Sequence, residues 1–324
     1  NAKGYGRIIR RENGEVLKIV EHKDATEEER AIHEVNAGIY CFDAQALFTA
    51  LTEVTNDNAQ GEYYLPDVLG ILRNAGEKIW AVVADNYEST LGINSRSQLA
   101  VAERILRRRK VEEIMSEGVT VIDPDTTFID AEVRVGMDTI LYPFTFLEGM
   151  TVIGEDCRIG PSVRFQNMVV GDGVTAHFTY AHDAVIEHHA DLGQFTHIRP
   201  DSHIGEGVRI GNFVEVKNSN IGVGAKLPHL SYIGDCDMGA YVNMGCGTIT
   251  VNYDGKNKYR TVIGDRAFIG CNSNLVAPVT VGDDAYIGAG STITHDVRQG
   301  TLAVARARQK EIEGWADKRK EKGM

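Results

Sequence analysis

The sequence predicts a parallel β-helix over most of the chain, preceded by a smaller α/β segment and a long helix. Three observations lead there: aliphatic residues recur every six positions, Gly accounts for 34 of the 324 residues, and aromatic residues make up only 7%. A six-residue period matches neither the 3.6-residue turn of an α-helix nor the alternation of a long strand. It matches short strands joined by corners, where each hexapeptide sends one apolar side chain into a narrow core.

The six-residue spacing appears in separate runs, and Gly directly follows several of the aliphatic residues. The runs are Ile129, Val135, Leu141, Leu147, Ile153 and Ile159; Leu192, Ile198, Ile204, Ile210 and Val216; Ile221, Leu227 and Ile233; and Ile263, Ile269, Leu275, Val281, Ile287 and Ile293. Gly suits the corners, where a positive φ or a close backbone approach is needed. The alternative, a β-sandwich, predicts alternating patterns with turn signals roughly every 8 to 12 residues.

The six-residue register breaks at two places, and at each the extra residues must bulge or loop out. Thr250 to Ile263 spans 13 residues rather than 12 and contains the polar run NYDGKNKYR. The second break, from Ile159 to Leu192, spans 33 residues and contains four histidines: His177, His182, His188 and His189.

One helix is predicted from Ser95 to Glu117, because Ser95 and Gln98 form a capping-box pattern and Gly118 is a stop signal. Before it, strand-like runs and a helical pattern are mixed. The strands are expected at Gly6–Arg10, Val16–Val20, Ala37–Phe42 and Lys78–Val83, and the helix near Leu65–Gly76. The expected domains are therefore 1–94, a linker helix at 95–118, a β-helix at 119–308 and a tail at 309–324. The Lys- and Glu-rich tail is expected to be a solvated helix or a frayed end.

Composition excludes several classes of protein. The formal charge of −12 argues against nucleic-acid binding, which needs a basic face. No run of 18 apolar residues and no signal peptide appear, so we expect a soluble, cytoplasmic chain without a membrane partner. The chain starts without Met, which suggests an N-terminally shortened protein. Five scattered cysteines without a C-x-x-C motif favour reduced thiols over disulfides or a zinc site.

Five motifs together give a specific resemblance. They are HLSYIGD at 229–235, NYDG at 252–255, GNFVEVK at 211–217, IRP at 198–200 and NAQGEYY at 58–64. With them the chain resembles the bacterial bifunctional N-acetylglucosamine-1-phosphate uridylyltransferase/glucosamine-1-phosphate N-acetyltransferases over essentially its whole length. The resemblance implies a partial Rossmann-like nucleotidyltransferase domain, a linker helix and a left-handed β-helix. It also implies a homotrimer acting in the last two cytosolic steps to UDP-N-acetylglucosamine, for peptidoglycan and lipopolysaccharide.

Acetyl transfer from acetyl-CoA to an amine requires the amine as free base, so the site needs a proton acceptor near neutral pH. His229 is the candidate, because it matches the general base of the family. The alternative is a histidine that merely fills a corner of the β-helix.

The phosphate of the sugar substrate is a dianion and requires local positive charge in an acidic protein. Arg199, Lys217 and Lys258 fit this need. By resemblance, the sugar phosphate is bound by Arg199, Lys217, Tyr232, Asn243 and Lys258, the last from the off-register loop. The alternative is that these cations are simply solvated.

The resemblance assigns acetyl-CoA to a further group of residues: Cys246, Asn252, Tyr253, Cys271, Ala289 and Arg306. A backbone N–H near Cys246 is expected to stabilise the oxygen of the thioester as it gains negative charge. The chain departs from the family here, since Ala is usual at position 246 and Ser is common at 271. Roles of the backbone survive this change, whereas side-chain roles do not follow, and either thiol could react with oxidants.

The resemblance also assigns Gly6, Glu21, Asn36 and Asn94 to the UDP-sugar side of the uridylyltransferase site, with Asn94 as part of an incomplete Mg²⁺ site. The family's UTP-binding Gly-rich loop does not appear in the sequence. We therefore expect this chain to lack uridylyltransferase activity.

Two other functions fit parts of the pattern. A γ-type carbonic anhydrase would bind zinc through histidines such as His177 and His182 with His188 or His189. A non-catalytic trimeric scaffold would need a decayed site, which the presence of His229, Asn252 and Lys258 argues against. A site on a single coil is shallow, so we expect a trimer with sites between subunits.

Overall fold

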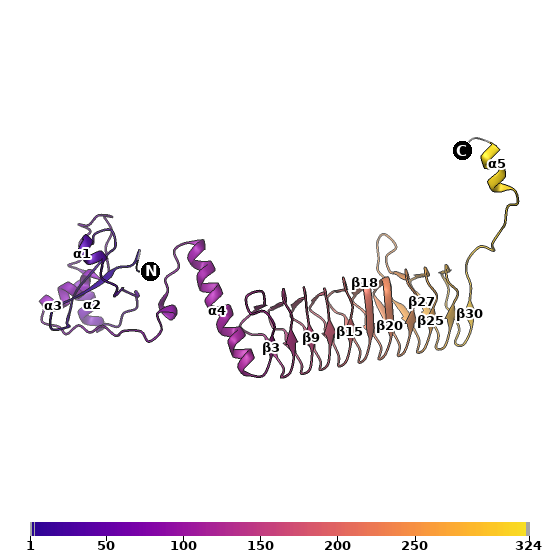
Figure 1. The fold of residues 1–324 in the computed structure, drawn as a ribbon, viewed down its shortest axis with the longest axis horizontal. Helices are drawn as coiled ribbons and strands as arrows, with labels where there is room; N and C mark the ends of the chain where they lie inside the picture. Colours follow the sequence, from indigo (N-terminus) through magenta and orange to yellow (C-terminus); the bar gives the residue numbers. More distant parts are fainter. Residues whose placement is uncertain (1, 3, 322–324) are drawn as a thin grey trace. The chain divides into compact units, whose positions relative to one another are not determined.

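The structure is a computed structural model that describes residue 2 and residues 4–321. It divides into two compact units, Asn1–Ile105 and Leu106–Met324, which are considered separately (Figure 1). Within the described residues, no helix combines the length and the apolar character that crossing a membrane would require.

The first unit is a small α/β arrangement. Its strands β1 (Arg7–Arg10) and β2 (Val16–Val20) pair antiparallel. Its helices are α1 (Glu27–Arg30), α2 (Ala44–Leu51), α3 (Asp67–Asn74) and the 3₁₀ turn η1 (Tyr87–Thr90). Thr26 begins α1 with a capping box to Glu29. The predicted strands at 6–10 and 16–20 and the helix near 65–76 are therefore confirmed within a few residues.

Two predicted strands of the first unit are wrong. Ala37–Phe42 and Lys78–Val83 are irregular, since neither pairs with a neighbouring strand in the described part of the chain. An apolar run becomes a strand only when a partner accepts its backbone hydrogen bonds. The side chains of Trp80 and Val82 are instead largely exposed.

The predicted long helix is α4 (Arg96–Ser116). The Ser95 hydroxyl accepts from the backbone N–H of Gln98, and the Gln98 side-chain oxygen accepts from the Ser95 hydroxyl and from the backbone N–H of Asn94. Gly118 stops the helix at φ +95°. Val111 and Ile114, near the C-terminal end, join the hydrophobic core of the second unit.

The second unit is the predicted left-handed parallel β-helix, whose coils each supply short strands to three flat faces. The first face contains β3 (Thr120–Val121), β6 (Ile140–Leu141), β9 (Arg158–Ile159), β12 (Thr175–Ala176), β15 (Asp191–Leu192), the first halves of β18 (Arg209–Lys217) and β20 (Lys226–Gly234), β22 (Asn243–Met244), β25 (Phe268–Ile269), β28 (Tyr286–Ile287) and β30 (Leu302–Ala303). The second face contains β4 (Phe128–Ile129), β7 (Phe146–Glu148), β10 (Arg164–Gln166), β13 (Tyr180–His182), β16 (His197–Ile198), the second halves of β18 and β20, β23 (Ile249–Val251), β26 (Asn274–Val276) and β29 (Thr292–Ile293). The third face contains β5 (Arg134–Val135), β8 (Val152–Ile153), β11 (Val169–Val170), β14 (Val185–Ile186), β17 (His203–Ile204), β19 (Asn220–Ile221), β21 (Cys236–Met238), β24 (Thr261–Ile263) and β27 (Val279–Val281).

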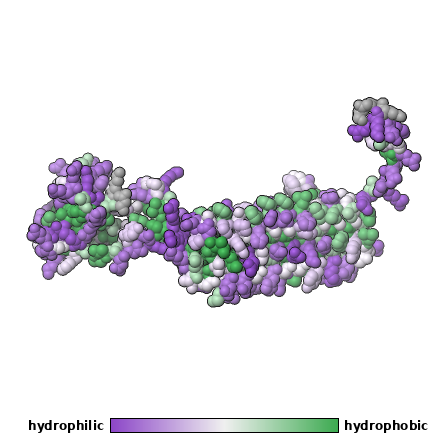
Figure 2. All heavy atoms as spheres, viewed as in Figure 1, coloured by the Kyte–Doolittle hydropathy of each residue, from purple (hydrophilic) through white to green (hydrophobic). Residues whose placement is uncertain are grey.

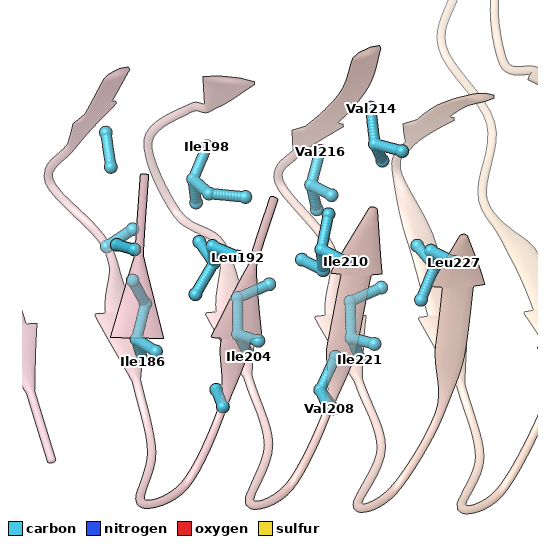
Figure 3. Close-up of a cluster of buried hydrophobic side chains, with 14 of the residues drawn as sticks. Ile186, Leu192, Ile198, Ile204, Val208, Ile210, Val214, Val216, Ile221 and Leu227 are labelled. Atoms are coloured by element: carbon cyan, nitrogen blue, oxygen red, sulfur yellow. The ribbon is translucent and has the colours of Figure 1, made fainter. Parts of the chain in front are cut away.

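The core of the β-helix consists of the predicted hexapeptide residues, all of which are buried. In Figure 3 these side chains form rows that point inward from successive coils, for example Leu192, Ile210 and Leu227 from the first face. Ile186, Ile204 and Ile221 form the matching row from the third face. After the last coil the chain continues to α5 (Trp315–Glu321), which confirms helix in the tail; the final three residues of the predicted tail lie outside the described residues.

Two departures from the regular coil position the candidate site. Strands β18 and β20 run without interruption from the first face to the second, around what we call the first corner. At the second corner, between the second and third faces, the pairs Tyr232↔Ile249 and Cys236↔Thr261 leave residues 253–260 without partners on the preceding coil. These residues form the predicted off-register loop, which we call the second-corner loop and which rises from the coils beside β18 and β20 in Figure 1.

Candidate functional site

Basic side chains gather at the end of the second face. Arg199 and Lys217 stand at equivalent positions of consecutive coils, because His197 pairs with Glu215 two residues before them. The Arg199 guanidinium forms an ion pair with Glu215 at 2.8 Å, and the Lys217 ammonium lies 3.6 Å from the Asp235 carboxylate. Two cations on neighbouring coils, both partly accessible, can receive an anion between them.

The carboxylate of Asp235 connects residues of this cluster through hydrogen bonds and an ion pair. It is buried and accepts hydrogen bonds from the side-chain amides of Asn218, at 2.5 Å, and Asn252. Burial alone raises the pKa of Asp235, but the two amides and the Lys217 ammonium outweigh burial and hold the pKa below its ordinary value. Asp235 is therefore an ionised group that links Lys217 to Asn252.

The third cation, Lys258, is carried by the exposed second-corner loop. The Lys217 ammonium is the main cause of a lowered pKa for Lys258, with smaller effects from burial and from Arg199. The loop thus brings Lys258 against two other positive charges. Such repulsion indicates a place where a bound anion would relieve the electrostatic cost.

Tyr232 and Asn252 pack closely beside these cations because position 234 is Gly. A Cβ atom there would lie 2.4 Å from the Tyr232 hydroxyl and 2.8 Å from the amide nitrogen of Asn252. Tyr232 can therefore fold over Gly234, and its hydroxyl accepts a 3.5 Å hydrogen bond from Asn252. The cations, a phenol and an amide meet at this point of the second face.

His229 lies at the first corner, at the other end of the second-face part of β20. Its side chain is exposed, and none of the described residues hydrogen-bonds to its imidazole. Gly234, which is opposite Lys217, lies five positions after His229, so their Cα atoms can be up to roughly 16 Å apart along a strand. Asn243 lies on the first face, on the coil after His229. In the strand register of a single chain, Arg199, Lys217, Tyr232 and Lys258 lie toward the second corner, whereas His229 lies at the first corner and Asn243 on the first face.

The residues expected to bind acetyl-CoA divide into two sets. Cys246, Cys271 and Ala289 form one row along the first corner, following the pairs Met244↔Ile269 and Ile269↔Ile287. Arg306, beyond β30, is exposed. Asn252 and Tyr253 lie instead at the second corner, where Asn252 contacts Asp235 and Tyr253 begins the loop.

In the first unit, Gly6, Glu21 and Asn36 lie side by side. A Cβ atom on Gly6 would lie 3.2 Å from the Glu21 carboxylate and 3.5 Å from Cβ of Asn36. Burial, followed by Asp24 and Asp67, raises the pKa of Glu21. Of these residues, Asn36 helps to line a cavity of about 1710 Å³, together with Tyr40 and Trp80.

The described residues do not form a magnesium site. Mg²⁺ prefers carboxylate oxygens in octahedral geometry, and no group of three or more His, Cys, Asp or Glu that could hold a metal occurs in the described part of the chain. Asn94, the expected ligand, has its backbone N–H bonded to Gln98.

Sequence reasoning missed three residues that support the cluster: Asp235, Asp237 and Arg260. An acidic residue at a corner of a β-helix ordinarily satisfies backbone groups, so its type does not indicate a functional role. The one available signal was position, since Asp235 ends the HLSYIGD motif and Arg260 ends the polar run of the loop.

Fold and site together define a transferase of the hexapeptide-repeat class, with a cluster of cationic side chains on the face of a left-handed β-helix. Residues 260–295 match the family model "Bacterial transferase hexapeptide (six repeats)". The chain is 57% identical over 318 residues to the bifunctional protein GlmU of Geobacillus sp. (strain WCH70), covering 98% of this chain and 69% of that protein. It is 54% identical to the bifunctional protein GlmU of Brevibacillus brevis, covering 100% of this chain and 70% of that protein. The chain belongs to the bifunctional GlmU family.

Solved structures give only distant similarity. The UDP-N-acetylglucosamine acyltransferase of Francisella novicida is 17% identical with a TM-score of 0.32, covering 57% of this chain and 67% of that chain. The acetyltransferase domain of PglB from Neisseria gonorrhoeae, solved with acetyl coenzyme A, is 16% identical with a TM-score of 0.32, covering 53% and 95%. At these scores the similarity adds nothing to the family assignment. Membership of the GlmU family leaves the carbonic anhydrase alternative without support, and His182, His188 and His203 each lie beside a carboxylate instead.

Proposed function

We propose that this protein transfers the acetyl group of acetyl-CoA to the amine of glucosamine-1-phosphate, releasing N-acetylglucosamine-1-phosphate and free CoA. The observation that carries the proposal is the cluster of Arg199, Lys217 and Lys258 on an otherwise acidic protein. Three cations facing one point suit a phosphate dianion. Membership of the GlmU family supports the choice of the sugar phosphate and of acetyl-CoA as substrates.

In this mechanism the three cations bind the phosphate and orient the sugar so that its amine faces His229. The imidazole accepts a proton from the amine as the nitrogen attacks the thioester carbon, and the C–S bond then breaks to release CoA. A backbone N–H at Cys246, at the position next to His229 in the first-corner row, stabilises the negative charge on the thioester oxygen. Positioned proton transfer is typically worth about 10² to 10⁴ in rate.

The active assembly in this proposal is a homotrimer. His229 and Asn243 occupy one side of the chain and the cations another, so the first corner of one copy must face the second face of a neighbour to complete the site. An apolar ridge along the first corner supports such contact: Phe144, Phe178, Phe195, Phe213 and Leu230 are all 38–60% exposed. We place the trimer in the cytoplasm.

The test measures free CoA thiol released from acetyl-CoA in the presence of glucosamine-1-phosphate. His229→Ala should lower kcat by about 10² to 10⁴ with little change in melting temperature, because the side chain is exposed and contributes little to the core. The matched control is His203→Ala, another partly exposed histidine, on the third face and paired with Glu187. Equal activity of the two variants would remove His229 from the mechanism, and no thiol release by the unmodified protein would refute the function itself.

The relatives are named as bifunctional, and the lack of uridylyl transfer by this chain stays a prediction. Release of pyrophosphate from UTP in the presence of Mg²⁺ and N-acetylglucosamine-1-phosphate would contradict it.

A further inference from the structure

The second-corner loop is internally ordered, and its hydrogen bonds to the β-helix are made at its two ends. Tyr253 and Lys258 form an antiparallel bridge, and the Asp254 carboxylate accepts hydrogen bonds from the backbone N–H groups of Lys256 and Asn257. All residues from 253 to 260 are exposed. The loop is therefore a small hairpin whose shape is set locally but whose placement depends on its two ends.

The N-terminal end of the loop is held at the cation cluster itself. Asn252 is buried, donates its side-chain amide to Asp235 and accepts the backbone N–H of Tyr259 at 2.9 Å. This end is part of the site already described.

The C-terminal end is held by Arg260, two residues after Lys258. Its guanidinium donates two hydrogen bonds to the Asp237 carboxylate, at 2.8 and 2.5 Å, which is the bidentate geometry that fixes an arginine most firmly. It also donates to the backbone carbonyls of Asn218 and Cys236, both at 3.3 Å. Asp237 accepts in addition from the Asn220 side chain at 2.6 Å, so the carboxylate is itself fixed on the third face.

We propose that the Arg260–Asp237 bridge positions Lys258 for binding of the substrate phosphate. Arg260 and Asp237 thus act on substrate affinity without touching the substrate. This inference rests on the proposed function. The need for an anchor follows from the charges. The Lys217 ammonium and, less strongly, Arg199 lower the pKa of Lys258, and they outweigh the attraction of the Asp235 carboxylate. Like charges repel, so an unanchored exposed loop would carry Lys258 away before an anion arrives.

Loss of the Arg260–Asp237 bridge should change the placement of Lys258 without destabilising the β-helix. Arg260 and Asp237 are partly exposed, at 40% and 43% of their side-chain surface. Ion pairs of this kind contribute little to global stability. Removing the bridge should therefore leave the β-helix folded and change mainly the placement of Lys258. Asn252 and Tyr253 should keep their places, because the N-terminal end of the loop is still held at Asp235.

The test compares Arg260→Gln with Arg266→Gln. Arg266 makes a similar two-point pair with Asp284, at 2.8 and 3.0 Å, on coils after the loop, so it is a matched control for loss of an exposed Arg–Asp bridge. We expect Arg260→Gln and Asp237→Asn to raise KM for glucosamine-1-phosphate about tenfold, with less than a threefold change in KM for acetyl-CoA. Arg260→Lys keeps the positive charge but lacks the two-pronged guanidinium. Its KM for glucosamine-1-phosphate should lie between the values for Arg260→Gln and Arg266→Gln. Arg266→Gln should change neither constant.

Two readouts separate this inference from the proposed function. Inorganic phosphate should bind about tenfold more weakly to Arg260→Gln than to Arg266→Gln, and backbone amides of residues 253–259 should exchange hydrogen faster only in the former. If the unmodified protein transfers no acetyl group, the proposed function fails while phosphate binding and amide exchange still decide the role of the bridge. Equal behaviour of the two variants in these readouts, or an equal rise of KM for both substrates, would overturn the inference.

Discussion

At the scale of single residues, the Asp235 carboxylate explains how three cations can be gathered on one small surface. A buried charge is tolerated only when it is paired and hydrogen-bonded. Asp235 meets that condition through Lys217, Asn218 and Asn252. The same carboxylate therefore holds one cation of the site and one end of the second-corner loop.

The lowered pKa of Asp235 leads to a prediction about stability and pH. A carboxyl whose pKa is lower in the folded state stabilises the protein above its ordinary pKa of about 3.9, and this contribution disappears as the pH falls through the lowered folded value. Asp235→Asn should therefore lower the melting temperature most near neutral pH, and the difference from the unmodified protein should shrink toward pH 2. Thermal denaturation followed by circular dichroism between pH 2 and 7 measures this. A difference that stays constant or grows in acid would show that the ionised carboxylate is not the stabilising group.

How far residues could be assigned from sequence depends on what they contact. Arg199, Lys217, Tyr232 and Lys258 could be named because they lie in motifs of a known family, and the structure places them together. Asp237 and Arg260 could not, because their bridge joins residues from different coils across the loop and depends on side-chain placement alone. The predicted roles of His229, Asn243 and the cysteines stay predictions, since one chain does not bring them to the cations.

At the scale of secondary-structure elements, the six-residue period predicts the β-helix so well because every coil repeats the same burial. Each apolar residue meets its equivalents on the coils above and below, so local pattern and tertiary packing agree. The first unit lacks such a repeat. There the apolar runs at 37–42 and 78–83 could not be distinguished from strands, because whether a run pairs depends on a distant partner.

The pairing of β18 and β20 depends on one glycine. A Cβ atom at Gly211 would lie 1.6 Å from the carbonyl oxygen of Pro228, directly before His229. Because that atom belongs to the backbone, the strands would have to separate. Gly211→Ala should lower the free energy of unfolding by roughly 3 kcal/mol or more, at the upper end of overpacking effects.

The control for this substitution is Gly288→Ala, where the added atom meets a side-chain tip of Val304 at 3.0 Å and no backbone atom nearer than 3.6 Å. Chemical denaturation of the two variants gives the comparison. Equal stability would mean that the two strands can part at no cost, contrary to the close approach seen here.

At the scale of the whole molecule, the apolar ridge of the first corner is costly for a single chain. Its members have positive φ values between +39° and +60°, a conformation that costs an L-residue roughly 1–2 kcal/mol and that bulky residues rarely adopt. Phe178, Phe195 and Phe213 nevertheless stack along the corner, with ring centroids 5.8 and 5.1 Å apart. Figure 2 shows apolar surface, in green, on the coils of the β-helix.

A strained and exposed aromatic row is explained if neighbouring copies cover it. The ridge ends at Leu230, the residue next to His229. Contact along the ridge would therefore carry the imidazole of one copy toward the cations of another, which is the arrangement that the divided site requires. Assembly and catalysis then depend on the same corner.

Phe213→Glu should accordingly convert the proposed trimer to monomers and abolish most acetyl transfer, although Phe213 is on the coil before His229. A buried carboxylate without a partner in an apolar contact is strongly unfavourable, whereas in the isolated chain the side chain is 57% exposed and the change leaves the core intact. Val223→Glu is the control, because Val223 is 42% exposed but lies outside the ridge. Sedimentation velocity combined with the thiol-release assay measures both effects. A variant that stays trimeric, or a monomer that retains full activity, would separate assembly from catalysis and contradict a site shared between copies.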